Sequence, residues 1–111
     1  MLSEDQIKAY EAQHTDIAHV LGPRATPTAD PAWELVMRRP KKGEYRRYKT
    51  ELASDRTKVD ANENLVRALV LFPDAMTFDK LLDKYPAIVD SEPVHKALGQ
   101  FVGIEAEQLG K

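Results

Sequence analysis

The sequence predicts a mainly helical α+β fold, in which an N-terminal helix and a β-hairpin precede a four-helix C-terminal part. Residues 33–39 alternate between apolar and polar side chains, with the period of two that is typical of a half-buried strand. Later segments instead repeat their apolar side chains at helical spacing. A chain of 111 residues has the length of a single domain.

The first helix is expected over residues 3–13. Ser3 can accept a hydrogen bond from a free backbone N–H at the start of a helix, and Gln6, three residues later, makes a capping box possible. Ile7 and Tyr10 would share one face of this helix.

A β-hairpin is expected next. Trp33, Leu35 and Met37 would point to one side of the strand at residues 33–39. A lone strand cannot satisfy its backbone groups, and the nearest available partner is residues 15–21, which could also extend the first helix. We therefore predict an antiparallel pair. Its loop, residues 22–32, contains three prolines and is expected to be extended and mobile.

Two helices are predicted in the middle of the chain. The first covers residues 41–53, after Pro40, and carries an apolar stripe made of Tyr45, Tyr48 and Leu52. The second, residues 59–72, is the most apolar helix and is bounded by Pro73.

Two further helices complete the predicted fold. Asp74 is placed to cap the first of them, and Pro86 stops it. The last helix lies within residues 90–103 and ends at Gly103, followed by Ile104, as in a left-handed C-terminal cap. We interpret residues 1–111 as one domain, in which a helix, strand and loop (1–32) precede further strand and helix segments (33–103) and a frayed tail (104–111).

Composition excludes several classes of protein. Cysteine is absent, which removes disulfides, cysteine-ligated metals and thiol nucleophiles. We find no signal peptide and no apolar run of the roughly 20 residues that a membrane span needs, so we expect no membrane association. The histidines are scattered, and no phosphate loop or nucleophile elbow is present. We therefore expect a protein that is not an enzyme and binds no cofactor or metal.

Residues 38–49, "RRPKKGEYRRYK", form the most unusual segment. They carry seven Arg or Lys residues and one acid, a net charge of +6, whereas the whole chain totals −2. This basic segment could bind nucleic acid, or it could be the outer face of a helix whose Tyr45 and Tyr48 lie in the core; helical spacing favours the second interpretation. The candidate partner-binding residues are Arg38, Arg39, Lys42, Arg46, Arg47 and Lys49.

Such a basic segment on an acidic remainder suits a protein partner, or self-association into a homo-oligomer, at least as well as it suits nucleic acid. Nucleic acid is the less favoured partner because dedicated nucleic-acid binders are usually basic overall.

Two segments resemble the small tail assembly chaperones of phages. In residues 33–52, Arg38, Pro40, Glu44, Tyr45 and Arg46 stand where the family pattern has them. Residues 64–88 are similar to the family's second run, in which an apolar stretch ends in aromatic-Pro and a capped helix ends in Tyr-Pro-Ala. The chain departs from the pattern at Lys41, where a small hydroxyl residue is expected, and in lacking a cysteine near residues 69–71.

The resemblance implies a cytoplasmic protein of the bacterial host that binds the tape-measure protein and keeps it soluble during tail assembly, often as an oligomer. Two alternatives stay open at this point. One is a structural tail or head–tail joining protein, and the other is a small nucleic-acid-binding regulator that uses the basic segment.

Overall fold

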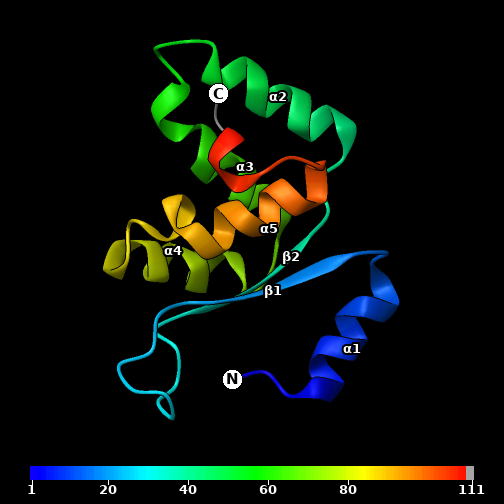
Figure 1. The fold of residues 1–111 in the computed structure, drawn as a ribbon, viewed down its shortest axis with the longest axis vertical. Helices are drawn as coiled ribbons and strands as arrows, with labels where there is room; N and C mark the ends of the chain where they lie inside the picture. The colour runs from blue at the N-terminus through cyan, green and yellow to red at the C-terminus, as the bar shows by residue number, and fades with distance from the viewer. Residues whose placement is uncertain (110–111) are drawn as a thin grey trace.

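The computed structural model describes residues 1–109, which form five α-helices and three β-strands (Figure 1). The elements are α1 (Glu4–Gln13), β1 (Ile17–Leu21), β2 (Glu34–Arg38), α2 (Lys42–Leu52), α3 (Ala61–Leu69), β3 (Val70–Phe72), α4 (Ala75–Lys84) and α5 (Glu92–Val102). Short 3₁₀ turns occur at Lys58–Asp60, Ile88–Asp90 and Ala106–Gln108. The predicted mainly helical α+β fold, with a helix and hairpin before four helices, is confirmed.

The strands form an antiparallel sheet in the order β1-β2-β3. The register of the hairpin runs from Ile17 opposite Arg38 to Leu21 opposite Glu34. It continues into the loop, where the Gly22 N–H donates to the Trp33 carbonyl at 2.8 Å. The predicted pairing of residues 15–21 with residues 33–39 is therefore correct.

The central strand β2 is more deeply buried than its alternating sequence predicts. Leu35 and Met37 belong to the main core, and Val36, which points to the opposite side, is also fully buried. Helices α2 to α5 lie on one side of the sheet, while α1 and the hairpin loop lie on the other (Figure 1). The expected half-buried strand is thus corrected to one whose middle is buried on both sides.

The third strand was not predicted. The helix expected over residues 59–72 ends at Leu69, and β3 follows directly. Pro73 disfavours a helical conformation at the residue before it, and Val70, Leu71 and Phe72 are residue types that suit a strand. The free edge of β2 supplies the partner for their backbone groups, with Phe72 opposite Val36.

The predicted caps at the starts of α1 and α4 and at the end of α5 are present. Ser3 Oγ accepts from the Gln6 N–H at 3.2 Å, and Gln6 Oε1 accepts from the Ser3 N–H at 2.7 Å. Asp74 Oδ1 accepts from the Thr77 N–H at 2.9 Å at the start of α4. At the end of α5, Gly103 has a φ of 82°, a left-handed conformation that favours glycine.

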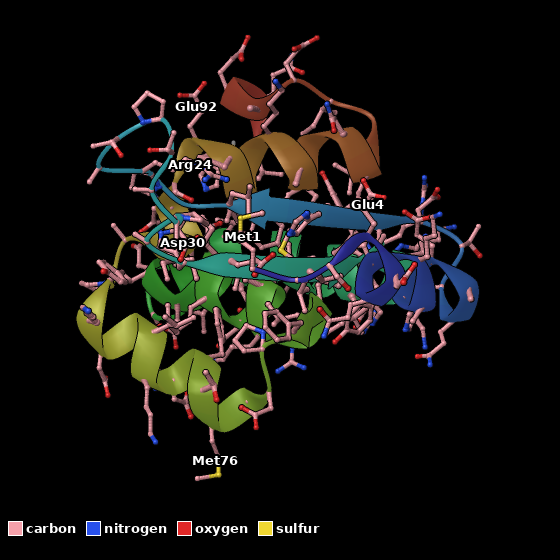
Figure 2. The ribbon with its side chains drawn as sticks, turned by 90° about the horizontal axis from the view of Figure 1, so that it is seen from below. Met1, Glu4, Arg24, Asp30, Met76 and Glu92 are labelled. Carbon is pink, nitrogen blue, oxygen red and sulfur yellow. The ribbon has the colours of Figure 1, made fainter. Side chains whose placement is uncertain are left out.

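The main core lies between β2 and the helices α2 to α5. Its largest fully buried side chains belong to Phe78, Leu35, Met37, Leu69, Ile88 and Leu98, with Val66 and Val94 beside them. Helix α1 contributes no buried residue. On α4, Met76 is 72% exposed and projects away from the fold (Figure 2). Among residues 1–109, no helix combines the length and the apolar character that a bilayer crossing requires.

The segment after α5 packs back onto that helix, so the frayed tail expected from residue 104 is wrong for residues 104–109. The Ile104 N–H donates to the Gly99 carbonyl at 2.9 Å, and Leu109 is only 8% exposed. A Cβ atom at Gly99 would lie 2.7 Å from the Ile104 carbonyl oxygen. The close return of the chain therefore depends on the missing side chain at position 99. Residues 110 and 111 of the expected tail lie outside the described residues.

We predict that Gly99→Ala lowers the free energy of unfolding by about 1–3 kcal/mol, because the added methyl group overlaps a backbone oxygen. Gly43→Ala is the matched control, since a Cβ at that helical position meets nothing within 4 Å. The control should leave stability unchanged or raise it by up to about 1 kcal/mol. Urea denaturation of both variants measures the difference, and equal stabilities would contradict the packing of the tail.

Candidate functional site

Residues 38–49 link the end of β2 to most of α2. The structure separates the six candidate bases of this segment into two groups. Arg38, Arg39 and Arg47 form ion pairs within the molecule. Lys42, Arg46 and Lys49 have no carboxylate within 4 Å among residues 1–109.

Arg38 joins three elements. Its two terminal nitrogens donate to the two carboxylate oxygens of Glu44, at 2.8 and 2.7 Å. One of the same nitrogens donates to the Ala68 carbonyl at 2.9 Å, in the last turn of α3, where carbonyls lack partners within the helix. This two-pronged geometry is the strong form of a charged hydrogen bond. Arg38 therefore connects β2, the first turn of α2 and the end of α3.

Glu44 also supplies the reciprocal half of a capping box at the start of α2, where Lys41 has no side-chain acceptor for the free N–H groups of the helix. Its carboxylate accepts from the Lys41 backbone N–H at 2.8 Å. The hydrogen bonds from Arg38, and then the one from Lys41, lower the pKa of Glu44 from 4.5 to about 2. Helix α2 consequently begins at Lys42 without a hydroxyl residue before it.

Arg39 and Arg47 are also engaged, but closer to solvent. Arg39 Nε donates to Asp16 Oδ2 at 2.8 Å, and its Nη1 donates to the Phe101 carbonyl at 3.3 Å. Arg47 pairs with Glu51, one turn along α2, at 3.1 Å. Arg39 directly follows β2, so its contact with the Phe101 carbonyl connects the end of β2 to the end of α5.

The three unpaired bases lie on one face of α2, because their spacing is i, i+4 and i+7. Together with Lys41 they border a groove of about 510 Å³ between α2 and the end of α5. The rest of its lining is apolar or aromatic and consists of Pro40, Tyr45, Phe101 and Val102. We call these eight residues the α2–α5 groove. No acidic residue lines it.

The two tyrosines of the segment have different environments. Tyr48 is 3% exposed, its hydroxyl donates to Asn62 Oδ1 at 2.7 Å, and burial raises its pKa to about 12. Tyr45 is only half-buried and meets Tyr48 edge-on, with 6.2 Å between ring centroids. The prediction that both belong to the core is correct for Tyr48 and wrong for Tyr45, which lies in the groove.

Five groove residues were not among the candidate binding residues, namely Pro40, Lys41, Tyr45, Phe101 and Val102. Lys41 was noted only as a departure from a family pattern. Phe101 and Val102 are half-buried, pack against the core and also line the groove. The sequence places both residues in the last turn of the last helix. That this turn lies beside α2 depends on contacts between distant segments, such as the one between Arg39 and the Phe101 carbonyl.

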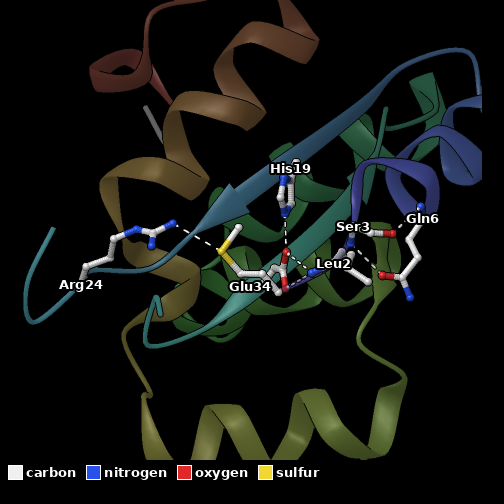
Figure 3. Close-up of polar contacts among 7 residues, drawn as sticks. Leu2, Ser3, Gln6, His19, Arg24 and Glu34 are labelled. Atoms are coloured by element: carbon white, nitrogen blue, oxygen red, sulfur yellow. Dashed lines mark hydrogen bonds and ion pairs between the residues drawn. The ribbon is translucent and has the colours of Figure 1, made fainter. Parts of the chain in front are cut away.

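Outside residues 38–49, the Glu34, His19 and His95 side chains contact other parts of the fold. Glu34 accepts from the Leu2 N–H with both carboxylate oxygens at 3.1 Å and pairs with His19 at 2.6 Å, which fastens the N-terminal segment to β2 (Figure 3). His95 lies 3.3 Å from the Asn62 side-chain nitrogen. Within residues 1–109, no three His, Asp or Glu side chains gather as metal ligands do.

Comparison with known proteins adds no assignment, since no family model, no curated protein and no solved structure matches the chain.

We predict that Glu44→Gln lowers the free energy of unfolding at pH 7 by about 1.5–3 kcal/mol, because it leaves the Arg38 guanidinium without its carboxylate. Glu63→Gln is the control. It removes a carboxylate from an exposed i, i+4 pair with Arg67 and should cost no more than about 0.5 kcal/mol. Thermal or urea unfolding compares the two.

The same pair predicts a pH dependence. The pKa of Glu44 is about 2 in the folded state, below its ordinary value of 4.5. Its contribution to stability is therefore complete above about pH 4.5 and is lost as the pH falls toward 2. The stability difference between the wild type and Glu44→Gln should shrink across this window. A difference that stays constant from pH 7 to pH 2.5 would contradict the ion pair.

Proposed function

We propose that this protein is a phage tail assembly chaperone that binds the tape-measure protein through the α2–α5 groove and keeps it soluble in the cytoplasm of the bacterial host. The interaction is a contact between proteins and requires no chemical step.

One observation carries the proposal: Lys42, Arg46 and Lys49, which have no carboxylate within 4 Å among residues 1–109, border a half-buried apolar floor. The ion pairs that connect this segment to the rest of the fold, or stabilise α2, involve Arg38, Arg39 and Arg47 and not these three bases. Aromatic and aliphatic side chains supply affinity at protein interfaces, and surrounding charges supply orientation and rate of association. The groove has both components.

The family resemblance supports the same surface. Of the motif residues, Arg38 and Glu44 fix the start of α2, whereas Pro40, Tyr45 and Arg46 line the groove. The motif therefore combines the residues that position the helix with residues that the helix displays. A tape-measure protein is long, helical and rich in exposed apolar faces, and such a client needs a small charged protein that covers them.

Nucleic acid is the less favoured partner. Phosphates would satisfy the lysines and Arg46, but they would leave Phe101 and Val102 without an apolar counterpart. The net charge of −2 also opposes binding to a polyanion at long range.

We predict that co-expression keeps the long helical tail protein soluble and that the two proteins co-purify. Reversing the groove charge with Lys42→Glu, Arg46→Glu and Lys49→Glu should reduce the recovered complex at least tenfold without unfolding the protein. The matched control reverses three exposed bases elsewhere that also have no ion pair among residues 1–109, with Lys8→Glu, Lys58→Glu and Lys80→Glu.

Equal loss in both triple variants would show that net charge, rather than the groove, governs binding. No co-purification with the wild type would overturn the chaperone proposal. Detection of this chain in finished phage particles by mass spectrometry would indicate a structural tail protein instead.

A further inference from the structure

The chemistry of the groove specifies its occupant more narrowly than the proposed function does. We propose that the α2–α5 groove binds an acidic amphipathic helix of the partner protein, with its apolar stripe on the groove floor and its carboxylates against the bases of α2. This inference rests on the proposed function, because it names the kind of partner segment that the same surface would recognise.

The charge of the groove requires an acidic partner. Lys41, Lys42, Arg46 and Lys49 all border it, and no carboxylate lines it. The contrast with the neighbouring bases is local, since Arg38, Arg39 and Arg47 on the same segment each have a carboxylate within 3.1 Å. A carboxylate-rich partner segment would supply the negative charges that the groove lining lacks.

The floor of the groove requires apolar side chains between those carboxylates. Tyr45, Phe101 and Val102 are half-buried and remain in part accessible to solvent. Covering apolar surface gains about 25 cal/mol for each Å² removed from water. A partner that is acidic but lacks an apolar stripe would leave this floor wet and would bind weakly.

The walls of the groove favour a helix over an extended strand. They are formed by α2, the two residues before it and the last turn of α5, so no sheet edge lines the groove and a strand would have none to pair with. From Lys42 to Lys49, α2 rises by roughly 10 Å. A partner helix lying alongside, with acids at intervals of three and four residues, would place carboxylates opposite these bases.

The N-terminal helix of a second copy fits the groove less well. Helix α1 carries Glu4, Asp5 and Glu11, but its larger apolar side chains, Ile7 and Tyr10, are half-buried within its own chain. Part of its apolar stripe is therefore already covered by its own chain, which leaves less apolar surface for the floor than a helix without such contacts would offer.

Binding of synthetic peptides to the full chain tests the inference. The probe is a fluorescein-labelled peptide of about 15 residues, which is about four helical turns, with leucines at helical spacing and glutamates on both sides of the stripe. Three comparison peptides replace the leucines by serine, replace the glutamates by lysine, or reproduce residues 1–14 of this chain. Fluorescence anisotropy gives each dissociation constant at 150 mM salt.

We expect the acidic amphipathic peptide to bind at least tenfold more tightly than any of the three. The Lys42→Glu, Arg46→Glu, Lys49→Glu variant should weaken its binding at least tenfold, and the Lys8→Glu, Lys58→Glu, Lys80→Glu control should not. Val102→Ser should also weaken it, which nonspecific attraction between charges does not predict. NMR shift changes should centre on Tyr45, Phe101 and Val102.

Four results would overturn the inference: equal binding of the serine peptide, tighter binding of the 1–14 peptide, shift changes away from the groove, or a DNA oligonucleotide that binds as tightly as the peptide. The results that would contradict the chaperone proposal differ from those that would contradict this inference. Peptide binding without recovery of the tape-measure protein would leave the recognition of acidic helices intact, and recovery of that protein without peptide binding would place its site elsewhere.

Discussion

The arrangement of this protein depends most directly on the ion pair between Arg38 and Glu44. Arg38 is the last residue of β2, and Glu44 lies in the first turn of α2, so the pair fixes the helix at the point where the chain leaves the sheet. The same guanidinium reaches the end of α3 through the Ala68 carbonyl. Both side chains are largely shielded from solvent, with 21% and 26% of their surfaces exposed, which strengthens the pair relative to one on an open surface. Because Glu44 also accepts from the Lys41 N–H, one carboxylate both anchors the helix and fixes the residue that precedes it.

With α2 held in this way, the basic segment serves two purposes. Arg38 and the more exposed Arg39 donate to carboxylates and to carbonyls of other elements, and they connect the end of β2 to the start of α2 and the end of α5. Lys41, Lys42, Arg46 and Lys49 lie around Tyr45 and border the groove. A charged segment that looks uniform in sequence is therefore divided by the fold into residues that support the structure and residues that are displayed to a partner. This division makes the groove, rather than the whole segment, the surface that a partner would meet.

Much of the fold could be predicted because local signals agreed with the tertiary structure. The Ser3 and Gln6 capping box, the Asp74 cap and the alternation from Trp33 to Met37 each reflect chemistry within a few residues. Strand β3 was missed because its apolar residues continue the pattern of α3, and only pairing with β2 distinguishes the two. The packing of Leu109 and the groove position of Tyr45 depend on contacts between distant segments, which helical spacing alone does not encode. Composition identified the candidate bases. The fold then places Asp16, Glu44 and Glu51 beside three of them, which distinguishes the paired bases from the unpaired ones.

The most direct test of this division is the free energy of unfolding of six single variants, in which each candidate base is replaced by glutamine. Arg38→Gln should cost more than about 1.5 kcal/mol, because it removes the guanidinium that donates to Glu44 and to the Ala68 carbonyl. Arg39→Gln should cost less, and Arg47→Gln almost nothing, since the Arg47 side chain is 80% exposed. Substitutions at Lys42, Arg46 and Lys49 should change stability by no more than about 0.5 kcal/mol. Equal losses at all six positions, or a neutral Arg38→Gln, would contradict the separation of supporting bases from displayed ones.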